Sequence, residues 1–200
     1  MKHLDEFILK SKHEANEKSI SDSFEAGGQV YINNMQYNFI RIKLWNDQIS
    51  MLFPDTYHEL NSEKADIKYP YKKRPDIILS LPNDEIDLVL SFVLDAGNDL
   101  TNSGKDIMNA MNQAFPANLN YEQGIFNRGK QKIFYFDFRS FSMNGSSYNV
   151  MFLCHVHGWM LIGNLTCDFH IYEKWSGYFM EIIQSIRLKD YEVGGCENEG

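Results

Sequence analysis

The hydrophobic pattern of the chain is clearest over residues 148–188, where two apolar segments flank His157 and Gly158. Gly158 can supply the positive φ that a two-residue hairpin turn requires. That turn sets a register in which Val156 pairs with Trp159, Cys154 with Leu161, Phe152 with Gly163 and Val150 with Leu165. One face of the hairpin is then apolar throughout and the other is apolar in its middle. This pattern predicts two strands inside a sheet that is covered on both sides.

The hairpin is followed by residues with the spacing of an amphipathic helix. Asp168 can cap the start of this helix, because its carboxylate can accept hydrogen bonds from the free amides of the first turn. Apolar residues then recur every three or four positions, at Ile171, Trp175, Phe179, Ile182, Ile183 and Ile186. Such a stripe predicts a helix that packs one face on the sheet.

The rest of the chain adds further strands and helices. Strand-like segments bounded by turn residues fall at 37–45, 49–53, 76–81, 86–94, 121–126 and 131–141. A short helix is expected over 61–69 behind Asn61 or Ser62, and a longer one, capped by Thr101 or Ser103, runs to Phe115. These elements predict an α+β fold, an α/β/α sandwich with a mostly antiparallel central sheet of about seven strands flanked by helices.

Composition divides the chain into three parts. Residues 1–30 are charged and poor in aromatic side chains, which predicts a partly flexible arm. Residues 31–188 are expected to form a single α+β domain, since 200 residues with 44% hydrophobic content support one core of ordinary size. Residues 189–200 are polar, acidic and glycine-containing, which is typical of a flexible tail.

The net charge of -8 and the pI near 5.2 argue against a nucleic-acid or anionic-membrane partner, because both would be repelled. No apolar run approaches the roughly 20 residues of a membrane span. The apolar run at residues 7–9 is too short for a secretory signal. We therefore expect a cytoplasmic protein without a membrane span.

The three cysteines do not predict a disulfide framework. Cys154 and Cys167 share a face of the hairpin but lie about six residue steps, or near 20 Å, apart, which is beyond the reach of a disulfide. They are expected to be buried free thiols. Cys154 and His155 point to opposite faces of the strand, which excludes a nucleophile and base pair.

His155 and His157 are candidate metal ligands, because residues at i and i+2 of a strand share a face and can share a zinc ion. A third ligand is missing, since Met160 is the predicted cross-strand neighbour of His155. His157 is in addition part of the turn. We therefore expect no metal and no other cofactor.

A basic loop is a candidate binding site for phosphate or an acidic peptide. Its residues are Tyr69, Lys72, Lys73 and Arg74, next to Lys68 and Tyr71. In an acidic chain a short basic loop is more often a solvated turn, and we favour that interpretation. Asp84, Glu85 and Asp87 are interpreted as ordinary turn charges.

A second candidate site lies on the strand at 131–141. Phe134, Phe136 and Phe138 are assigned to the core by their alternation. The residues between and after them, Tyr135, Asp137 and Arg139, are expected to face outward or to line a rim. With His155 they can form the pocket of a small-ligand-binding protein or an enzyme. The sequence contains no GxSxG, P-loop or GxGxxG motif.

Three short motifs and the closing helix resemble the PsbP-like superfamily. The motifs are Phe53-Pro54, Lys68-Tyr69-Pro70 and Arg74-Pro75, and the helix that contains Trp175 follows two apolar strands. The resemblance covers about residues 37–188 and points to a bacterial branch of unassigned function. The superfamily also holds PsbP, a yeast Ran-binding nuclear-import factor and DcrB-like bacterial proteins. It implies an antiparallel sheet with flanking helices and implies no catalytic residue.

Members of this superfamily are mostly binding or assembly factors, and some act as chaperones for secreted effectors. The first hypothesis is therefore a noncatalytic protein-binding module, a cytoplasmic adaptor or chaperone in a bacterial secretion or assembly pathway, with another protein as its partner. The alternative is a small-ligand-binding protein or an enzyme that uses the pocket near Tyr135 and His155.

Overall fold

The computed structural model describes residues 29–32, 34–70, 74–81, 86–95, 97, 99–129, 131–143 and 145–189. Its strands are β1 (Gln29–Ile32), β2 (Met35–Leu44), β3 (Ile49–Pro54), β4 (His58–Glu59), β5 (Ile77–Leu81), β6 (Ile86–Leu94), β7 (Leu119–Arg128), β8 (Gln131–Ser142), β9 (Gly145–Val156), β10 (Trp159–Asp168) and β11 (Arg187–Leu188). Its helices are α2 (Ser62–Lys68), α3 (Leu100–Ala114) and α4 (Tyr172–Gln184), with a 3-10 turn, η1 (Phe169–Ile171), before α4.

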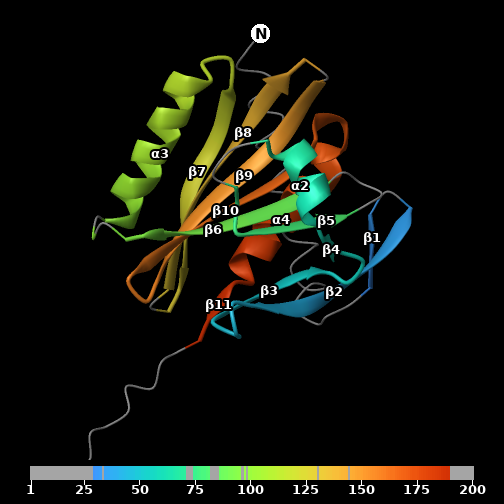
Figure 1. Cartoon of the computed structure of the whole chain (residues 1–200), viewed down its shortest axis with the longest axis horizontal. Helices are drawn as coiled ribbons and strands as arrows, with labels where there is room; N and C mark the ends of the chain where they lie inside the picture. The colour runs from blue at the N-terminus through green and yellow to red at the C-terminus, as the bar shows by residue number, and fades with distance from the viewer. Residues whose placement is uncertain are drawn as a thin grey trace, which may run out of the picture.

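The strands form two antiparallel sheets. The large sheet has seven strands in the order β4-β5-β6-β10-β9-β8-β7, and the small sheet has four in the order β1-β2-β3-β11. Figure 1 shows α3 on one side of the large sheet, and α4 between the large sheet and the small one. The predicted α+β fold, with its central sheet of about seven strands flanked by helices, is confirmed.

The β9–β10 hairpin lies in the middle of the large sheet and has the predicted register. Val156 pairs with Trp159 and Cys154 with Leu161. His157 and Gly158 have φ values of 48° and 81°, and two positive values suit a hairpin turn whose twist matches that of the strands. The strand β6 pairs with β10 and β8 pairs with β9, so the hairpin has neighbours on both sides.

The two faces of this hairpin are both covered, as the sequence predicts. On one face Phe152, Cys154 and Leu161 are completely buried in the main core. On the other face Leu153 and Met160 belong to a second core under α3. Phe134, Phe136 and Phe138 are buried as expected, and they lie in this second core.

The helix α4 fills the space between the two sheets. Its residues Trp175 and Phe179 are buried, together with the predicted isoleucines at 182, 183 and 186. From the small sheet, Tyr37 packs edge-on against Trp175 with 5.2 Å between ring centroids. Phe39 stacks on Tyr178 of α4 at 6.0 Å. One apolar stripe therefore joins both sheets into a single core.

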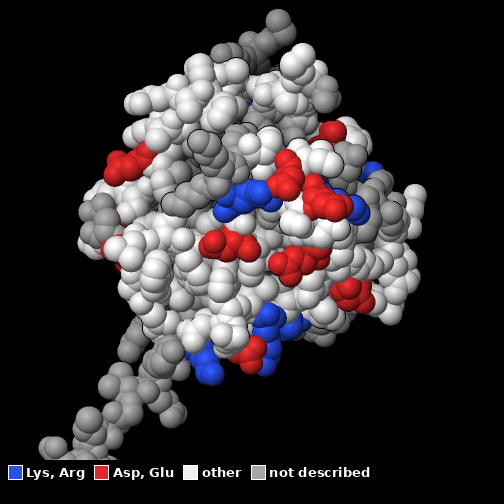
Figure 2. Space-filling view, in the orientation of Figure 1, with Lys and Arg blue, Asp and Glu red and all other residues white. Residues whose placement is uncertain are grey.

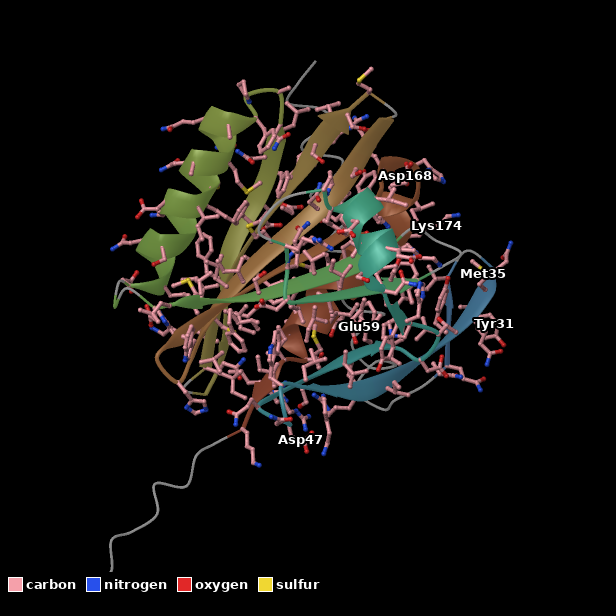
Figure 3. The ribbon with its side chains drawn as sticks, in the orientation of Figure 1. Tyr31, Met35, Asp47, Glu59, Asp168 and Lys174 are labelled. Carbon is pink, nitrogen blue, oxygen red and sulfur yellow. The ribbon has the colours of Figure 1, made fainter. Side chains whose placement is uncertain are left out.

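The sequence pattern does not distinguish the small sheet from the central sheet. Its β2–β3 pairing was predicted, but the strands lie in a separate sheet that β11 closes by pairing with β3. Figure 3 places Tyr31 and Met35 on the β1–β2 hairpin and Asp47 at the β2–β3 turn, away from the large sheet.

The starts of α2 and α3 can be compared with the predicted caps. Asn61 caps α2, accepting a hydrogen bond from the Lys64 amide at 3.0 Å. The expected cap of α3 at Thr101 or Ser103 is wrong, because Asp99 caps that helix and accepts from the Thr101 amide at 3.0 Å. Asp99 lies two residues before Thr101, and its carboxylate accepts hydrogen bonds from the free amides of the first helical turn better than a hydroxyl inside the helix can.

Several expectations concern residues outside the described part of the chain. Of the expected arm over residues 1–30, residues 1–28 lie outside it, whereas Gln29 and Val30 form the start of β1. Of the expected tail over residues 189–200, residues 190–200 lie outside it. Lys72 and Lys73 of the basic loop, and Cys196, also lie outside it. Within the described residues, no helix is long and apolar enough to cross a membrane.

Replacing Trp175 with alanine tests the packing of α4. Trp175 is only 1% exposed, and removing a buried tryptophan costs about 3 to 5 kcal/mol of unfolding free energy because it leaves a cavity. Urea unfolding followed by circular dichroism measures this loss. Trp159→Ala is the control, since that side chain is 47% exposed and its loss should cost much less. Equal losses for the two variants would contradict the assignment of α4 to the core.

Candidate functional site

Basic side chains converge at the end of the large sheet where the β7–β8 and β9–β10 turns lie. They line a groove of about 930 Å³, called here the basic groove. Its lysine and arginine residues are Arg128, Lys132, Arg187 and Lys189. Asp99 is the one acidic residue among the described residues that line it. The face shown in Figure 2 carries acidic and basic side chains interspersed. The groove differs from that face because positive charges predominate in it.

Three separate parts of the fold bring these cations together. Arg128 ends β7 and Lys132 lies near the start of β8, on either side of a turn in which Gly129 has a φ of 60°. Arg187 lies on β11, which the end of α4 delivers to the edge of β3, where Arg187 pairs with Ser50. The groove therefore spans the junction between the large and small sheets.

The C-terminal end of α4 holds two arginine side chains in this region. Arg128 Nη1 donates to the carbonyl of Gln184 at 3.1 Å, and Arg41 Nη1 donates to the carbonyl of Ser185 at 3.0 Å. Carbonyls at a helix C-terminus carry partial negative charge and attract cations. Burial lowers the pKa of Arg41, and the charges of Arg187 and Arg128 lower it further. Arg187 and Arg128 therefore lie close enough to Arg41 for their charges to repel it.

Gln131 adds a polar group to the groove. Its Nε2 atom is buried and has no hydrogen-bond partner among the described residues. A buried donor without a partner costs about 1 to 3 kcal/mol. An amide N–H beside lysine and arginine side chains is suited to an oxygen atom of a carboxylate or phosphate.

The two candidate metal ligands, His155 and His157, make different contacts in this region. His155 Nδ1 lies 2.6 Å from Asp95 Oδ2, and His157 Nε2 lies 3.1 Å from the carbonyl of Lys189. Met160 is the cross-strand neighbour of His155, as predicted. Over the residues that the structure describes, no three His, Cys, Asp or Glu side chains gather as a metal site would require.

An apolar hollow of about 620 Å³ adjoins the basic groove. It is lined by Phe92, Val156 and Trp159, with Gln48 at its side, and His157 lines both spaces. Trp45 packs on Phe92 with 4.5 Å between ring centroids. The hairpin turn thus separates a cationic surface from an apolar one that exposes nearly half of Trp159.

The four residues proposed for a rim pocket do not come together. Tyr135 pairs with Phe152 and Asp137 with Val150, so these residues face α4, as Arg139 does. His155 lies on the opposite face of the sheet with Leu153, because successive strand residues alternate. The predicted pocket lined by these four residues is therefore wrong.

Asp137 was expected to face outward or to line a rim, but it is buried and only 2% exposed. Its Oδ1 accepts from the Glu122 amide at 2.6 Å, and its Oδ2 accepts from the Tyr148 hydroxyl at 2.8 Å. Burial, with the adjacent Asp137 charge, raises the pKa of Tyr148 well above its ordinary value. Both bonds fix β7 and β9 to β8, which is a structural role.

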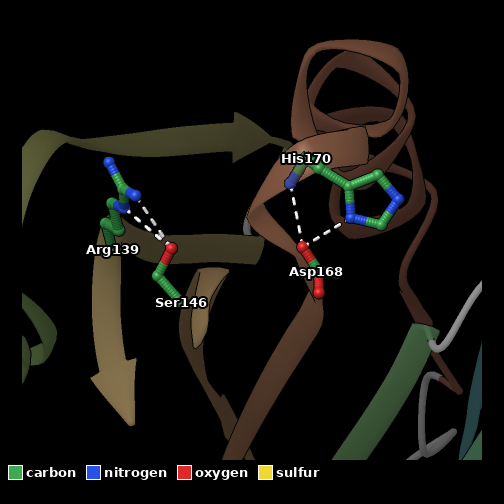
Figure 4. A network of polar contacts seen from close by, with 4 residues as sticks. All are labelled: Arg139, Ser146, Asp168 and His170. Atoms are coloured by element: carbon green, nitrogen blue, oxygen red, sulfur yellow. Dashed lines mark hydrogen bonds and ion pairs between the residues drawn. The ribbon is translucent and has the colours of Figure 1, made fainter. Parts of the chain in front are cut away.

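Arg139 is held by its own neighbours. Its Nε and Nη2 atoms donate to Ser146 Oγ at 3.1 and 2.9 Å (Figure 4). Its guanidinium lies 3.7 Å from the centroid of the Phe169 ring. In the same view Asp168 Oδ1 accepts from the His170 amide at 2.9 Å and lies 2.6 Å from His170 Nδ1. These hydrogen bonds lower the pKa of Asp168. Asp168 therefore caps the short turn η1, whereas the predicted helix itself, α4, begins after Ile171, which makes no side-chain cap hydrogen bond.

Tyr69 of the basic loop contacts a buried carboxylate. Asp87 is 1% exposed and not an ordinary turn charge, contrary to expectation. Its Oδ2 accepts from the Tyr69 hydroxyl at 2.8 Å and lies 2.6 Å from Lys68 Nζ, while its Oδ1 accepts from Ser80 Oγ at 2.7 Å. This network fastens the end of α2 to β5 and β6.

Arg74 forms an ion pair with Asp66 of α2. Within the described part of the basic loop, Tyr69 and Arg74 therefore have partners inside the protein. Asp84 and Glu85 lie outside the described residues, as Lys72 and Lys73 do.

The two cysteines in the described part of the chain are not suited to nucleophilic chemistry. Cys154 and Cys167 are free and buried, as predicted. Burial raises the pKa of the Cys154 thiol to about 12, which keeps it protonated at neutral pH. Burial also raises the pKa of Cys167.

The Asp87 network predicts a loss of stability in Asp87→Ala. The substitution leaves the hydroxyls of Tyr69 and Ser80 without their acceptor, at a cost of about 1 to 3 kcal/mol for each buried group left unpaired. Chemical denaturation measures the change. Asp66→Ala is the matched control, because its ion pair with Arg74 is exposed and worth about 1 kcal/mol or less. An Asp87→Ala variant as stable as the control would contradict the network's role.

Sequence comparison finds no family model and no curated protein that matches this chain. Solved structures do match. The solution structure of cyanobacterial PsbP from Synechocystis sp. PCC 6803 is 11% identical, covers 76% of this chain and 92% of its own, and has a TM-score of 0.59. A protein of unknown function from Pseudomonas aeruginosa, described as a putative regulator, is 9% identical, with coverage of 76% and 98% and a TM-score of 0.50.

A third structure, from Bacteroides thetaiotaomicron, is 8% identical, covers 76% of this chain and 48% of its own, and has a TM-score of 0.50. At these identities the similarity concerns the fold alone. The PsbP-like fold that the sequence motifs suggested is confirmed.

Proposed function

We propose that this chain, a protein with the PsbP-like fold, is a noncatalytic binding module that holds an acidic segment of another protein in the basic groove. The observation that carries the proposal is the gathering of four lysine and arginine side chains around one groove of a chain whose net charge is -8. Charges of one sign focused in a groove raise the local concentration of an oppositely charged partner.

The side chains of the groove suit carboxylates. Arginine offers two parallel N–H groups to a carboxylate, and Arg187 and Lys189 are exposed at the groove. The unpaired Nε2 of Gln131 gives a further donor. Such complementarity sets specificity and the association rate for an acidic partner.

The adjoining hollow suits an apolar side chain of the same partner. Trp159 and Phe92 line it, and an exposed tryptophan beside an apolar hollow is typical of residues that dominate binding energy. The groove and the hollow meet at His157, so one extended segment can reach both. The partner is therefore an acidic segment that contains an apolar anchor residue.

Two further observations support binding over catalysis. The thiols of Cys154 and Cys167 are buried and protonated, and the Asp137 and Arg139 side chains are held in structural contacts. The resemblance to PsbP-like binding and assembly factors supports an adaptor or chaperone role in a bacterial cytoplasm, in a secretion or assembly pathway.

Binding of a fluorescein-labelled peptide that alternates glutamate with leucine tests the proposal. Fluorescence anisotropy should show salt-sensitive binding, and the double variant Arg187→Glu and Lys189→Glu should bind at least about tenfold more weakly, which corresponds to about 1.4 kcal/mol. The matched control is Lys43→Glu with Lys64→Glu, which changes the net charge equally at exposed positions on β2 and α2.

The control variant should bind like the natural protein. Equal weakening by both double variants would show that only net charge matters, and would contradict a site in the groove. Absence of peptide binding, with inorganic phosphate or citrate bound instead, would contradict a protein partner.

A further inference from the structure

The edges of the two sheets differ strongly in length. The large sheet ends in β4, which has two residues, and in β7, which has ten. The small sheet ends in β1, with four residues, and β11, with two. Among the described residues, β7 is therefore the longest strand whose outer backbone groups have no neighbouring strand. Such an edge is a template for pairing with another chain, and most proteins keep it short or block it.

The second half of β7 is regular enough to accept another strand. The pairing of β7 with β8 is irregular between Asn120 and Gln123 and continuous from Gln123 to Arg128. The Glu122 amide points inward, where it donates to Asp137. Alternation then turns the backbone groups of Gln123, Ile125 and Asn127 outward. Neither proline nor lysine, the usual blocking residues, occurs between 122 and 128.

The sequence of this edge complements itself about Ile125. If two β7 strands pair antiparallel with the two Ile125 residues opposite each other, Gln123 faces Asn127 and Glu122 faces Arg128 of the other copy. The arrangement sets two opposite-charge pairs and one apolar pair across the junction, and such cross-strand pairs stabilise a sheet. The outward residues face one another, as a hydrogen-bonded ladder requires.

From this self-complementarity we infer that two copies of the chain pair through β7 and join their large sheets across a two-fold axis at Ile125. Ile125 is 39% exposed in the single chain and would be covered by its symmetry mate. The contact uses the same surface on both copies, which is the commonest form of protein dimer. The contact shares Arg128 with the basic groove. Its test uses cysteine cross-linking without any acidic peptide, so its failure can be distinguished from failure of the proposed function.

A cysteine at the symmetry axis tests the register. In a Cys196→Ser background, Ile125→Cys places two Cα atoms about 5.5 Å apart, within the range of a disulfide. Mild oxidation should therefore give a covalent dimer on a non-reducing gel. The matched control is Asn127→Cys, whose symmetry mate lies about four residues, or roughly 13 Å, away. This control should stay monomeric, and mixing it with Gln123→Cys should restore cross-linking.

Proline at the same position tests the dimer without oxidation. Ile125→Pro removes an outward N–H, which an edge strand tolerates, so the fold should persist by circular dichroism while the dimer is lost. Analytical ultracentrifugation at rising protein concentration measures the association. The inference is overturned if the natural chain stays monomeric at every concentration, or if Asn127→Cys cross-links as readily as Ile125→Cys. It is also overturned if a folded Ile125→Pro variant dimerises as before.

Discussion

The burial of α4 between two sheets is the interaction on which the rest of this structure depends. The small sheet consists of one hairpin with two short strands added, and a sheet of that size needs an apolar partner layer to be stable. The helix α4 supplies it through Trp175 and Tyr178, which contact Tyr37 and Phe39. The opposite side of the same helix rests on the β9–β10 hairpin. Loss of this layer would expose apolar surface on both sheets.

The same helix also shapes the candidate binding site. Its C-terminal carbonyls hold Arg41 and Arg128, and the chain that leaves it carries Arg187 to the edge of β3. The end of α4 thus helps to position Arg128 and Arg187, two of the cations of the groove. The apolar hollow lies beside these cations because His157, in the turn of the β9–β10 hairpin, lines both the hollow and the groove. The helix α4 rests on the same hairpin. Packing and the proposed binding function therefore share one element.

Local signals in the sequence were sufficient for much of the fold. The His157-Gly158 turn and strand alternation defined the hairpin register, and helical spacing identified the face of α4 that Trp175 occupies. Contacts between distant segments carried no such signal. Asp87 looks like a turn charge until Tyr69 and Ser80 are placed beside it. The basic groove draws its cations from residues 128–132 and 187–189, which only the pairing of β11 with β3 brings together.

Native-state hydrogen exchange tests most directly whether α4 joins both sheets into one unit. The amides of β2 and β3 should exchange with the same opening free energy as those of α4 and the β9–β10 hairpin, close to the free energy of global unfolding, since they share one core. Exchange of β2 and β3 through a separate opening of much lower free energy, while the hairpin remains protected, would contradict this account.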